Sequence, residues 1–113
     1  MTTIIAGSRT CPSYSIVEHA IRASGFNITH VISGGAYGAD RFGEQWAARN
    51  GIPVTVEPAR WRQYHQRAGI IRNERMAGMA RQLIACWDGQ SRGTAHMVEI
   101  AKQKGLKIYV YRF

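Results

Sequence analysis

The most constraining feature of this sequence is a regular alternation of short apolar runs with segments of helical periodicity. The apolar runs predict five strands, at residues 2–6, 30–32, 53–56, 83–87 and 107–111. Between them, apolar residues recur at helical spacing and predict helices over 13–24, 38–50, 69–80 and 94–104. Glycines follow three of these segments as stop signals, at Gly25, Gly51 and Gly105. Residues 59–68, rich in arginine and aromatic side chains, predict a loop.

Strands that alternate with helices pair in parallel, because each helix carries the chain back to the same end of the sheet. The strands are almost continuously apolar, which favours a sheet covered by helices on both faces. The chain has 113 residues, 45% of them hydrophobic, enough for one core and too few for two. We therefore predict a single α/β domain over residues 1–113, a doubly wound parallel sheet of about five strands. In the second helix, the spacing turns Phe42 and Trp46 inward and Glu44 outward.

Arginine dominates the charge of the chain. Lys and Arg together number 15 against 7 Asp and Glu, a formal net charge of +8, and 12 of the 15 are arginines. This balance favours anionic partners such as nucleotide phosphates or a nucleic-acid backbone, because the planar guanidinium binds paired phosphate oxygens. The competing interpretation is a charge that only keeps the chain in solution.

Several classes of protein are disfavoured by what the sequence lacks. No apolar run approaches the ~18 residues that a membrane span needs. The first nine residues lack the basic and apolar regions of a secretory signal, so we expect a soluble, cytoplasmic protein without a membrane partner. Cys11 and Cys86 lie in no Cys-x-x-Cys pattern, and the four histidines are scattered. The sequence therefore predicts no disulfide framework, no metal site and no cofactor.

In a doubly wound sheet, ligands bind beyond the carboxyl ends of the strands, so the loops that follow the strands are the candidate sites. Three of these loops, at 7–9, 33–40 and 88–94, place glycine or hydroxyl residues before a helix. Such glycines let backbone N–H groups approach a phosphate, and the helix N-terminus adds a favourable dipole. Together with residues 72 and 73, the loops supply the candidate ligand-binding residues Gly7, Ser8, Arg9, Gly34, Gly35, Gly38, Asp40, Arg72, Asn73, Asp88, Ser91, Arg92, Gly93 and Thr94.

Each candidate also has a purely structural interpretation. Tight turns need glycine, and serine, threonine, asparagine and aspartate cap helices or form turns without any ligand. The loops match neither Gly-x-Gly-x-x-Gly nor a P-loop, which disfavours a conventional dehydrogenase or ATPase. The candidate catalytic side chains are Arg72, Asp40 and Asp88; His96 is a possible acid or base, and Cys11 has no histidine placed nearby to activate it.

Four segments taken together resemble the SLOG superfamily, in particular its small YspA-like branch of phage and bacterial proteins. They are residues 7–9 (GSR), 33–40 (SGGAYGAD), 71–76 (IRNERM) and 87–96 (WDGQSRGTAH). The resemblance implies a Rossmann-like fold that binds nucleotides or nucleotide-derived ligands, including ADP-ribose-type signals. The implied ligand site comprises the loop residues named above.

The resemblance extends to the LOG-type phosphoribohydrolases, with one departure. Arg72 to Met76 is similar to their Arg-x-x-x-Met segment, and Gly93 and Thr94 match their glycine-rich loop. Their catalytic glutamates fall two and three positions after that threonine, where this chain has His96 and Met97. Cleavage of an N-glycosidic bond builds positive charge on the sugar, which a carboxylate normally stabilises. The resemblance therefore carries over ligand binding but not this catalysis.

Three functions compete on this sequence. The first is binding of a nucleotide or ADP-ribose-type derivative, as a sensor or sequestering protein. The second is an N-glycosidase that uses Asp40 or Asp88 as its carboxylate. The third is nucleic-acid binding through residues 60–75, which hold five arginines, one acid and two aromatic side chains; the related DNA-processing protein DprA resembles this use. Tyr109, Tyr111 and Phe113 at the last strand further predict a homo-oligomer.

Overall fold

Five parallel strands form one sheet in the order β3-β2-β1-β4-β5. The structure is a computed structural model that describes all residues from 1 to 113. The elements, in chain order, are β1 (Thr2–Gly7), α1 (Tyr14–Ser24), β2 (His30–Ser33), α2 (Ala39–Arg49), β3 (Val54–Val56), α3 (Trp61–Tyr64), the 3-10 turn η1 (His65–Arg67), α4 (Ala68–Met79), β4 (Gln82–Trp87), α5 (Arg92–Gln103) and β5 (Lys107–Arg112). The predicted doubly wound α/β fold is confirmed.

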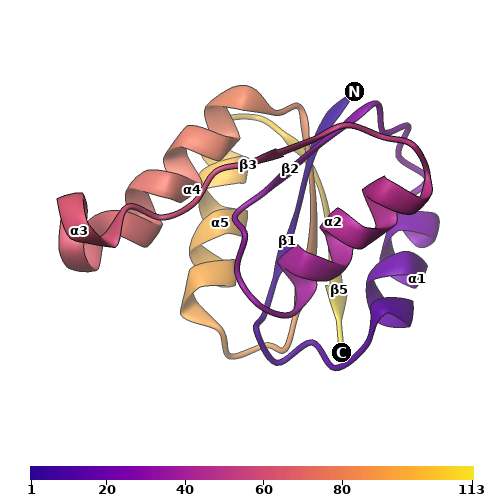
Figure 1. Ribbon diagram of the computed structural model, residues 1–113, viewed down its shortest axis with the longest axis horizontal. Helices are drawn as coiled ribbons and strands as arrows, with labels where there is room; N and C mark the ends of the chain where they lie inside the picture. Colours follow the sequence, from indigo (N-terminus) through magenta and orange to yellow (C-terminus); the bar gives the residue numbers. More distant parts are fainter.

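Helices cover both faces of the sheet, α1 and α2 on one side and α4 and α5 on the other (Figure 1). Successive residues of a strand point to opposite faces, so neighbouring isoleucines of β1 join different cores. Ile5 packs with residues of α1 and α2, whereas Ile4 packs with Met76 of α4 and Met97 of α5. All four side chains are 0–1% exposed. Two apolar layers therefore fix the central strand β1 from both sides.

The direction of the chain reverses at β1. From β1 it runs outward to β2 and β3, and then crosses over the sheet to β4 and β5 on the other side of β1. Ile4 of β1 is accordingly paired both with Ile32 of β2 and with Leu83 of β4. The loops after β1 and β4 leave the sheet toward opposite faces, which opens a crevice at the carboxyl ends of these two strands. In doubly wound sheets, such a crevice is the usual place for a ligand.

Residues 59–68 are not simply the loop that the sequence predicts. The backbone N–H groups of Gln63 and Tyr64 both bond to the carbonyl of Arg60, which closes the single turn α3. His65 then takes a positive φ of 53° and ends that turn, and α4 begins at Ala68. A helix of four residues is too short for apolar periodicity to reveal it. Figure 1 shows α3 beyond the end of α4, away from the sheet.

Two further details of the fold concern side-chain direction and helix length. Glu44, predicted to point outward, is half-buried and accepts a 2.6 Å hydrogen bond from the hydroxyl of Ser33 at the end of β2. A polar partner on the neighbouring strand draws the carboxylate inward, and the helical pattern cannot show this. None of the helices is long and apolar enough to cross a lipid bilayer.

Candidate functional site

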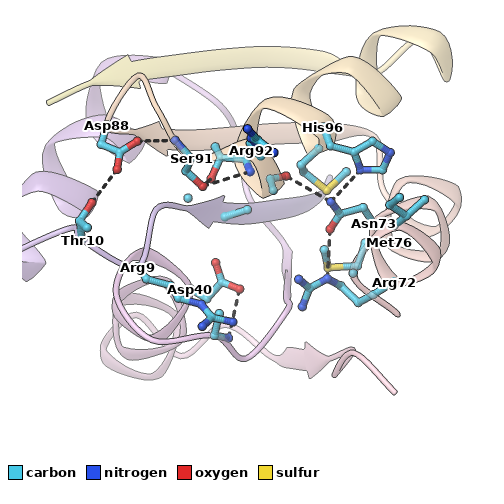
Figure 2. Close-up of a pocket in the computed structure, with 18 of the residues that line it drawn as sticks. Arg9, Thr10, Asp40, Arg72, Asn73, Met76, Asp88, Ser91, Arg92 and His96 are labelled. Atoms are coloured by element: carbon cyan, nitrogen blue, oxygen red, sulfur yellow. Dashed lines mark hydrogen bonds between the residues drawn. The ribbon is translucent and has the colours of Figure 1, made fainter. Parts of the chain in front are cut away.

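A cleft of about 530 Å³ lies at the carboxyl ends of β1 and β4, between the start of α5 and the side of α4. In Figure 2 its labelled side chains come from the loop after β1, from α2, from α4, from the loop between β4 and α5, and from the start of α5. Ten of the residues singled out from the sequence line this one cleft: Gly7, Arg9, Asp40, Arg72, Asn73, Asp88, Ser91, Arg92, Gly93 and Thr94. The three loops thus meet in space, as the sequence predicts for a shared site.

The four remaining candidates do not line the main cleft. Gly34 and Gly35 border a smaller hollow next to it. Ser8 is only 1% exposed and lies beneath the cleft. Gly38 packs against the backbone of the first loop, since a Cβ there would lie 2.6 Å from the carbonyl oxygens of both Ser8 and Arg9. Ser8 and Gly38 therefore hold the loops together instead of facing a ligand.

Ser8 joins all three loops through hydrogen bonds. Its hydroxyl accepts from the backbone N–H of Asp88 at 3.0 Å, which ties the loop after β4 to the loop after β1. Its carbonyl accepts from the N–H groups of Cys11 and Ala39, at 3.1 and 3.3 Å. Gly38, with a φ of +78°, allows the close approach that brings Ala39 there. The relative positions of the three loops are set at this buried serine.

Both carboxylate oxygens of Asp88 already accept hydrogen bonds within the protein. Its Oδ1 accepts from the N–H groups of Gln90 and Ser91, both at 2.8 Å, and its Oδ2 accepts from the hydroxyl of Thr10 at 2.8 Å. The backbone N–H groups of Gln90 and Ser91, followed by Thr10, lower the pKa of Asp88 to about 2. Asp88 is thus an ionised turn residue with its oxygens in use. It is poorly suited to donate a proton to a ligand.

The start of α5 offers unused hydrogen-bond donors to the cleft. Ser91 caps the helix, and its hydroxyl accepts from the N–H of Thr94 at 3.4 Å. The backbone N–H groups of Arg92 and Gly93 have no acceptor within the chain, and neither do those of Arg9 and Thr10 across the cleft. The helix dipole adds partial positive charge at this end. Free amides and a helix N-terminus are the features that bind phosphate oxygens.

A hydrogen-bonded chain of side chains joins α4 to both walls of the cleft. Arg72 donates from Nη1 to the carbonyl of Gly34 at 2.9 Å and from Nε to Oδ1 of Asn73 at 3.0 Å. The side-chain nitrogen of Asn73 lies 3.3 Å from the carbonyl of Gly93 and 3.1 Å from Nδ1 of His96. Asn73 is 4% exposed, and its side-chain amide is hydrogen-bonded within the protein, where it positions Arg72 and His96. Donation by Asn73 makes Nδ1 of His96 an acceptor and leaves Nε2 as the protonated nitrogen.

Asp40 is a buried carboxyl at the edge of the cleft. It is 4% exposed, accepts a 3.3 Å hydrogen bond from the N–H of Ala36 and makes no ion pair within 4 Å. Burial raises its pKa to about 6, although the N–H of Ala36 and the charge of Arg72 act in the opposite direction. Burial likewise lowers the pKa of Arg72; the charge of Asp40 acts in the opposite direction, and the charge of Arg9 adds to the lowering. Asp40 therefore exchanges its proton near neutral pH.

The cysteines show no sign of reactivity. Both are buried, and burial raises the pKa of Cys11 and, to about 12, that of Cys86. Neither thiol is ionised near neutral pH, so neither is an activated nucleophile. No group of three or more His, Cys, Asp and Glu side chains is arranged to hold a metal ion.

Several lining residues were not among the sequence candidates. Thr10 directly follows the Gly-Ser-Arg segment, and its hydroxyl donates a hydrogen bond to Asp88, which lies 78 positions further along the chain. Sequence spacing cannot reveal this contact. Met76 and Met97 line the apolar side of the cleft. Met76 ends the segment 71–76 that carries the family resemblance, whereas Met97 reads in the sequence as an ordinary core residue. Gln66 reaches the cleft from the segment predicted as a loop, and so does Trp61, one of the two aromatic side chains that the sequence indicates for stacking on a base.

The sheet order, the parallel strands and the cleft at the reversal of strand order define a Rossmann-like α/β protein. The family model described as the YspA, cpYpsA-related SLOG family matches residues 1–64. Over 115 aligned residues, the chain is 30% identical to the Gene 61 protein of Mycobacterium phage D29, with 93% of this chain and 91% of that protein covered. The chain belongs to the YspA-related SLOG family, as its sequence motifs predict.

A solved structure shares the fold. The DNA processing protein A (DprA) from Streptococcus pneumoniae superposes with a TM-score of 0.76 at 20% sequence identity. The match covers 96% of this chain and 49% of the DprA chain, so the present chain spans about half of that protein. At this identity the likeness concerns the arrangement of strands and helices.

Proposed function

We propose that the chain binds a nucleotide or an ADP-ribose-type nucleotide derivative in the cleft between β1 and β4, as a sensor or sequestering protein. The observation that carries this proposal is the surplus of unused donors around one cavity. Four backbone N–H groups lack acceptors there, and the guanidinium groups of Arg9 and Arg92 make no hydrogen bond or ion pair. Donors without acceptors favour a ligand with several anionic oxygens.

The size and lining of the cleft agree with a nucleotide. Its volume of about 530 Å³ falls within the ~300–1,000 Å³ of small-molecule sites. Met76, Met97 and Ile70 supply apolar surface for a base or sugar ring, opposite the polar loops. Membership of the SLOG family supports the same class of ligand.

Isothermal titration calorimetry tests this proposal. The protein is titrated with AMP, ADP, ADP-ribose and a cyclic ADP-ribose isomer at fixed salt and pH. We expect saturable binding to at least one nucleotide, weakened at least tenfold by Arg92→Ala, with Arg22→Ala as the matched control. Arg22 is exposed on α1 and pairs only with Glu18. Absence of binding across the whole panel would reject the proposal.

A second candidate function is hydrolysis of a nucleotide N-glycosidic bond, and Asp40 is the observation that favours it. Asp40 is a buried carboxyl beside the cleft with a pKa of about 6, so its ionised form is available at neutral pH to stabilise positive charge on a sugar. Asp88 is already engaged by three donors. Incubation with AMP, ADP-ribose or NAD, followed by chromatography for the free base, tests this candidate. Activity that persists in Asp40→Asn would exclude Asp40 as its carboxylate.

Nucleic-acid binding is the third candidate, and the exposed arginines around α3 favour it. Arg60, Arg62 and Arg67 are all exposed and surround Trp61, which is 53% exposed. Such a segment suits a phosphate backbone with bases stacked on the aromatic ring. Fluorescence anisotropy with single-stranded DNA at several salt concentrations tests it, because affinity must fall steeply as salt rises. A flat salt response would exclude this mode.

We also propose that the protein acts in the cytoplasm. A separate proposal is that two copies of the chain associate through β5. This strand is paired on one side only, and Val110 and Phe113 are 37% and 36% exposed there. An open strand edge is a surface on which a second copy can add its own strand. Sedimentation velocity would show a dimer that Val110→Lys dissociates.

A further inference from the structure

The segment between β3 and α4, residues 58–67, is fastened at its two ends and loosely held between them. Before it, the backbone N–H of Glu57 donates to the carbonyl of Ser33 at 2.7 Å, and Oε1 of Glu57 lies 3.4 Å from Nη1 of Arg75 on α4. After it, Ala68 begins α4 and is 1% exposed. Residues 58–67 form no side-chain hydrogen bond or salt bridge, and no residue of α3 or η1 is buried. A segment with so few contacts opens and closes at low cost in free energy.

The backbone of this segment is strained at His65, where α3 meets η1. His65 is the one residue other than glycine that has a positive φ in this chain. Its φ of 53° comes with a ψ of −126°, which lies outside the left-handed helical region that such residues usually adopt. Strained backbone of this kind gathers in segments that change conformation. A rotation of His65 to an ordinary φ would relieve the strain and turn α3 relative to α4.

The mouth of the cleft has uncovered apolar surface next to α3. Trp61 and Ile70 both line the cleft, yet they are 53% and 42% exposed. Cη2 of Trp61 lies 3.8 Å from the position that a Cβ would take on Gly69, so the ring rests on the first turn of α4 where no side chain blocks it. In Figure 1, α3 extends away from the sheet. Movement of α3 toward the cleft would bury this apolar surface, which is favourable.

The charges on the two sides of the mouth oppose that movement until an anion lies between them. Residues 58–67 carry no acidic residue and three arginines, namely Arg60, Arg62 and Arg67. Three further arginines line the cleft against two carboxyl groups: Arg9, Arg72 and Arg92 against Asp40 and Asp88. Like charges on the segment and in the cleft repel each other. An anionic ligand would change this repulsion into attraction on both sides.

We propose that residues 58–67 form a lid, open in this structure, that turns about His65 and closes over the cleft when an anionic ligand binds. On closure, Trp61 covers the ligand and the exposed side of Ile70 becomes buried. The ligand shifts the lid toward the closed arrangement because it contacts the Trp61 ring more fully there. This inference rests on the proposed function and adds a conformational step to it, in which the lid determines how long the ligand stays bound.

Amide hydrogen exchange tests the lid, followed residue by residue by NMR without ligand and with saturating nucleotide. The nucleotide is whichever of AMP, ADP and ADP-ribose binds most tightly in calorimetry. We expect exchange at Arg62, Gln63 and Tyr64 to slow at least fivefold. These three residues line neither the cleft nor the smaller hollow, so a ligand against a fixed wall would leave their rates unchanged. The matched control is the exposed turn at Lys104 and Gly105, where we expect no change.

A variant of the lid tests the same step by kinetics. Trp61→Ala should raise the dissociation rate of that nucleotide at least tenfold in stopped-flow measurements and change the association rate less than twofold, because the lid closes after the ligand has entered. Tyr64→Ala is the matched control, since Tyr64 belongs to the same turn but lines neither space, and it should change neither rate.

The failure of the lid and the failure of ligand binding give different results. Slower exchange confined to Trp61 and Gln66, the two lid residues that line the cleft, would show a fixed wall and overturn the lid while nucleotide binding stands. An unchanged dissociation rate in Trp61→Ala would overturn it as well. If none of the three nucleotides binds, the proposed function is rejected and the lid with it.

Discussion

Replacement of Asp40 by asparagine should stabilise the protein at neutral pH. Asn keeps the shape of the side chain and an oxygen for the 3.3 Å bond from Ala36. It removes the charge that burial disfavours. The prediction follows from the direction of the pKa shift, because a carboxyl with a raised pKa holds its proton more tightly in the folded chain than in the unfolded one.

The size of the effect follows from the two pKa values. The pKa of Asp40 is about 6 in the folded protein against 3.8 as an isolated group, and each unit of difference corresponds to ~1.4 kcal/mol. Its contribution to folding stability is therefore fully present below pH 3.8 and is lost as the pH rises through 6. Above that pH the ionised carboxylate costs about 3 kcal/mol, a large share of the ~5–15 kcal/mol that holds a typical domain together.

Urea denaturation at intervals between pH 4 and pH 8 measures this difference. We expect Asp40→Asn to match the natural protein near pH 4 and to exceed its free energy of unfolding by about 3 kcal/mol at pH 8. Asp88→Asn is the control with the opposite sign. The pKa of Asp88 is lowered to about 2, so its loss should destabilise the chain at neutral pH. A variant Asp40→Asn that is less stable at pH 8 would show that Asp40 is held as a carboxylate by Arg72, and would refute this reasoning.

Three other predictions follow from the geometry of the cleft. Gly38→Ala should lower the free energy of unfolding by about 2–4 kcal/mol in urea denaturation, because the added Cβ lies 2.6 Å from two carbonyl oxygens at a residue with positive φ. The control Gly25→Ala also has a positive φ but no atom within 4 Å of its Cβ, and should cost only about 1 kcal/mol. Equal costs of the two substitutions would argue against the contact at Gly38. Asn73→Ala should cost about 2–4 kcal/mol by thermal or urea unfolding, because it leaves the Gly93 carbonyl and Nε of Arg72 without their partner. ADP-ribose should bind more tightly at pH 5.5 than at pH 7.5 by calorimetry, because protonation of Asp40 removes negative charge near the ligand's diphosphate; a dependence that persists in Asp40→Asn would assign it elsewhere.

The strands and the order of elements were predictable because they depend on local patterns. Runs such as Leu83 to Trp87 are apolar throughout, which is what burial on both faces of a parallel sheet requires. The short helix α3 was missed because four residues carry no period, and its single turn is set by Arg60. The inward position of Glu44 was missed because its partner, Ser33, lies on another element.

The cleft shows the same limit of sequence reasoning. Glycine-rich loops after parallel strands indicated where a site forms, since topology alone brings those loops to one edge. The sequence does not indicate which side chains face the cavity and which form the hydrogen bonds that join the loops around it. Ser8 and Asn73 both look like ligand contacts in the sequence, yet the hydroxyl of Ser8 holds Asp88 and the amide of Asn73 holds Gly93 and His96. Such roles depend on partners 20 to 80 positions away.

The shared anchor at Ser8 has a consequence for how such a site diversifies. Because one buried residue fixes the loops after β1, β2 and β4 together, insertions into any of these loops near the anchor disturb all walls at once. The segment around α3 is free of that constraint and reaches the site only from its rim. New ligand preferences are therefore expected to arise through changes in the length and composition of residues 59–67, with the anion-facing loops left intact.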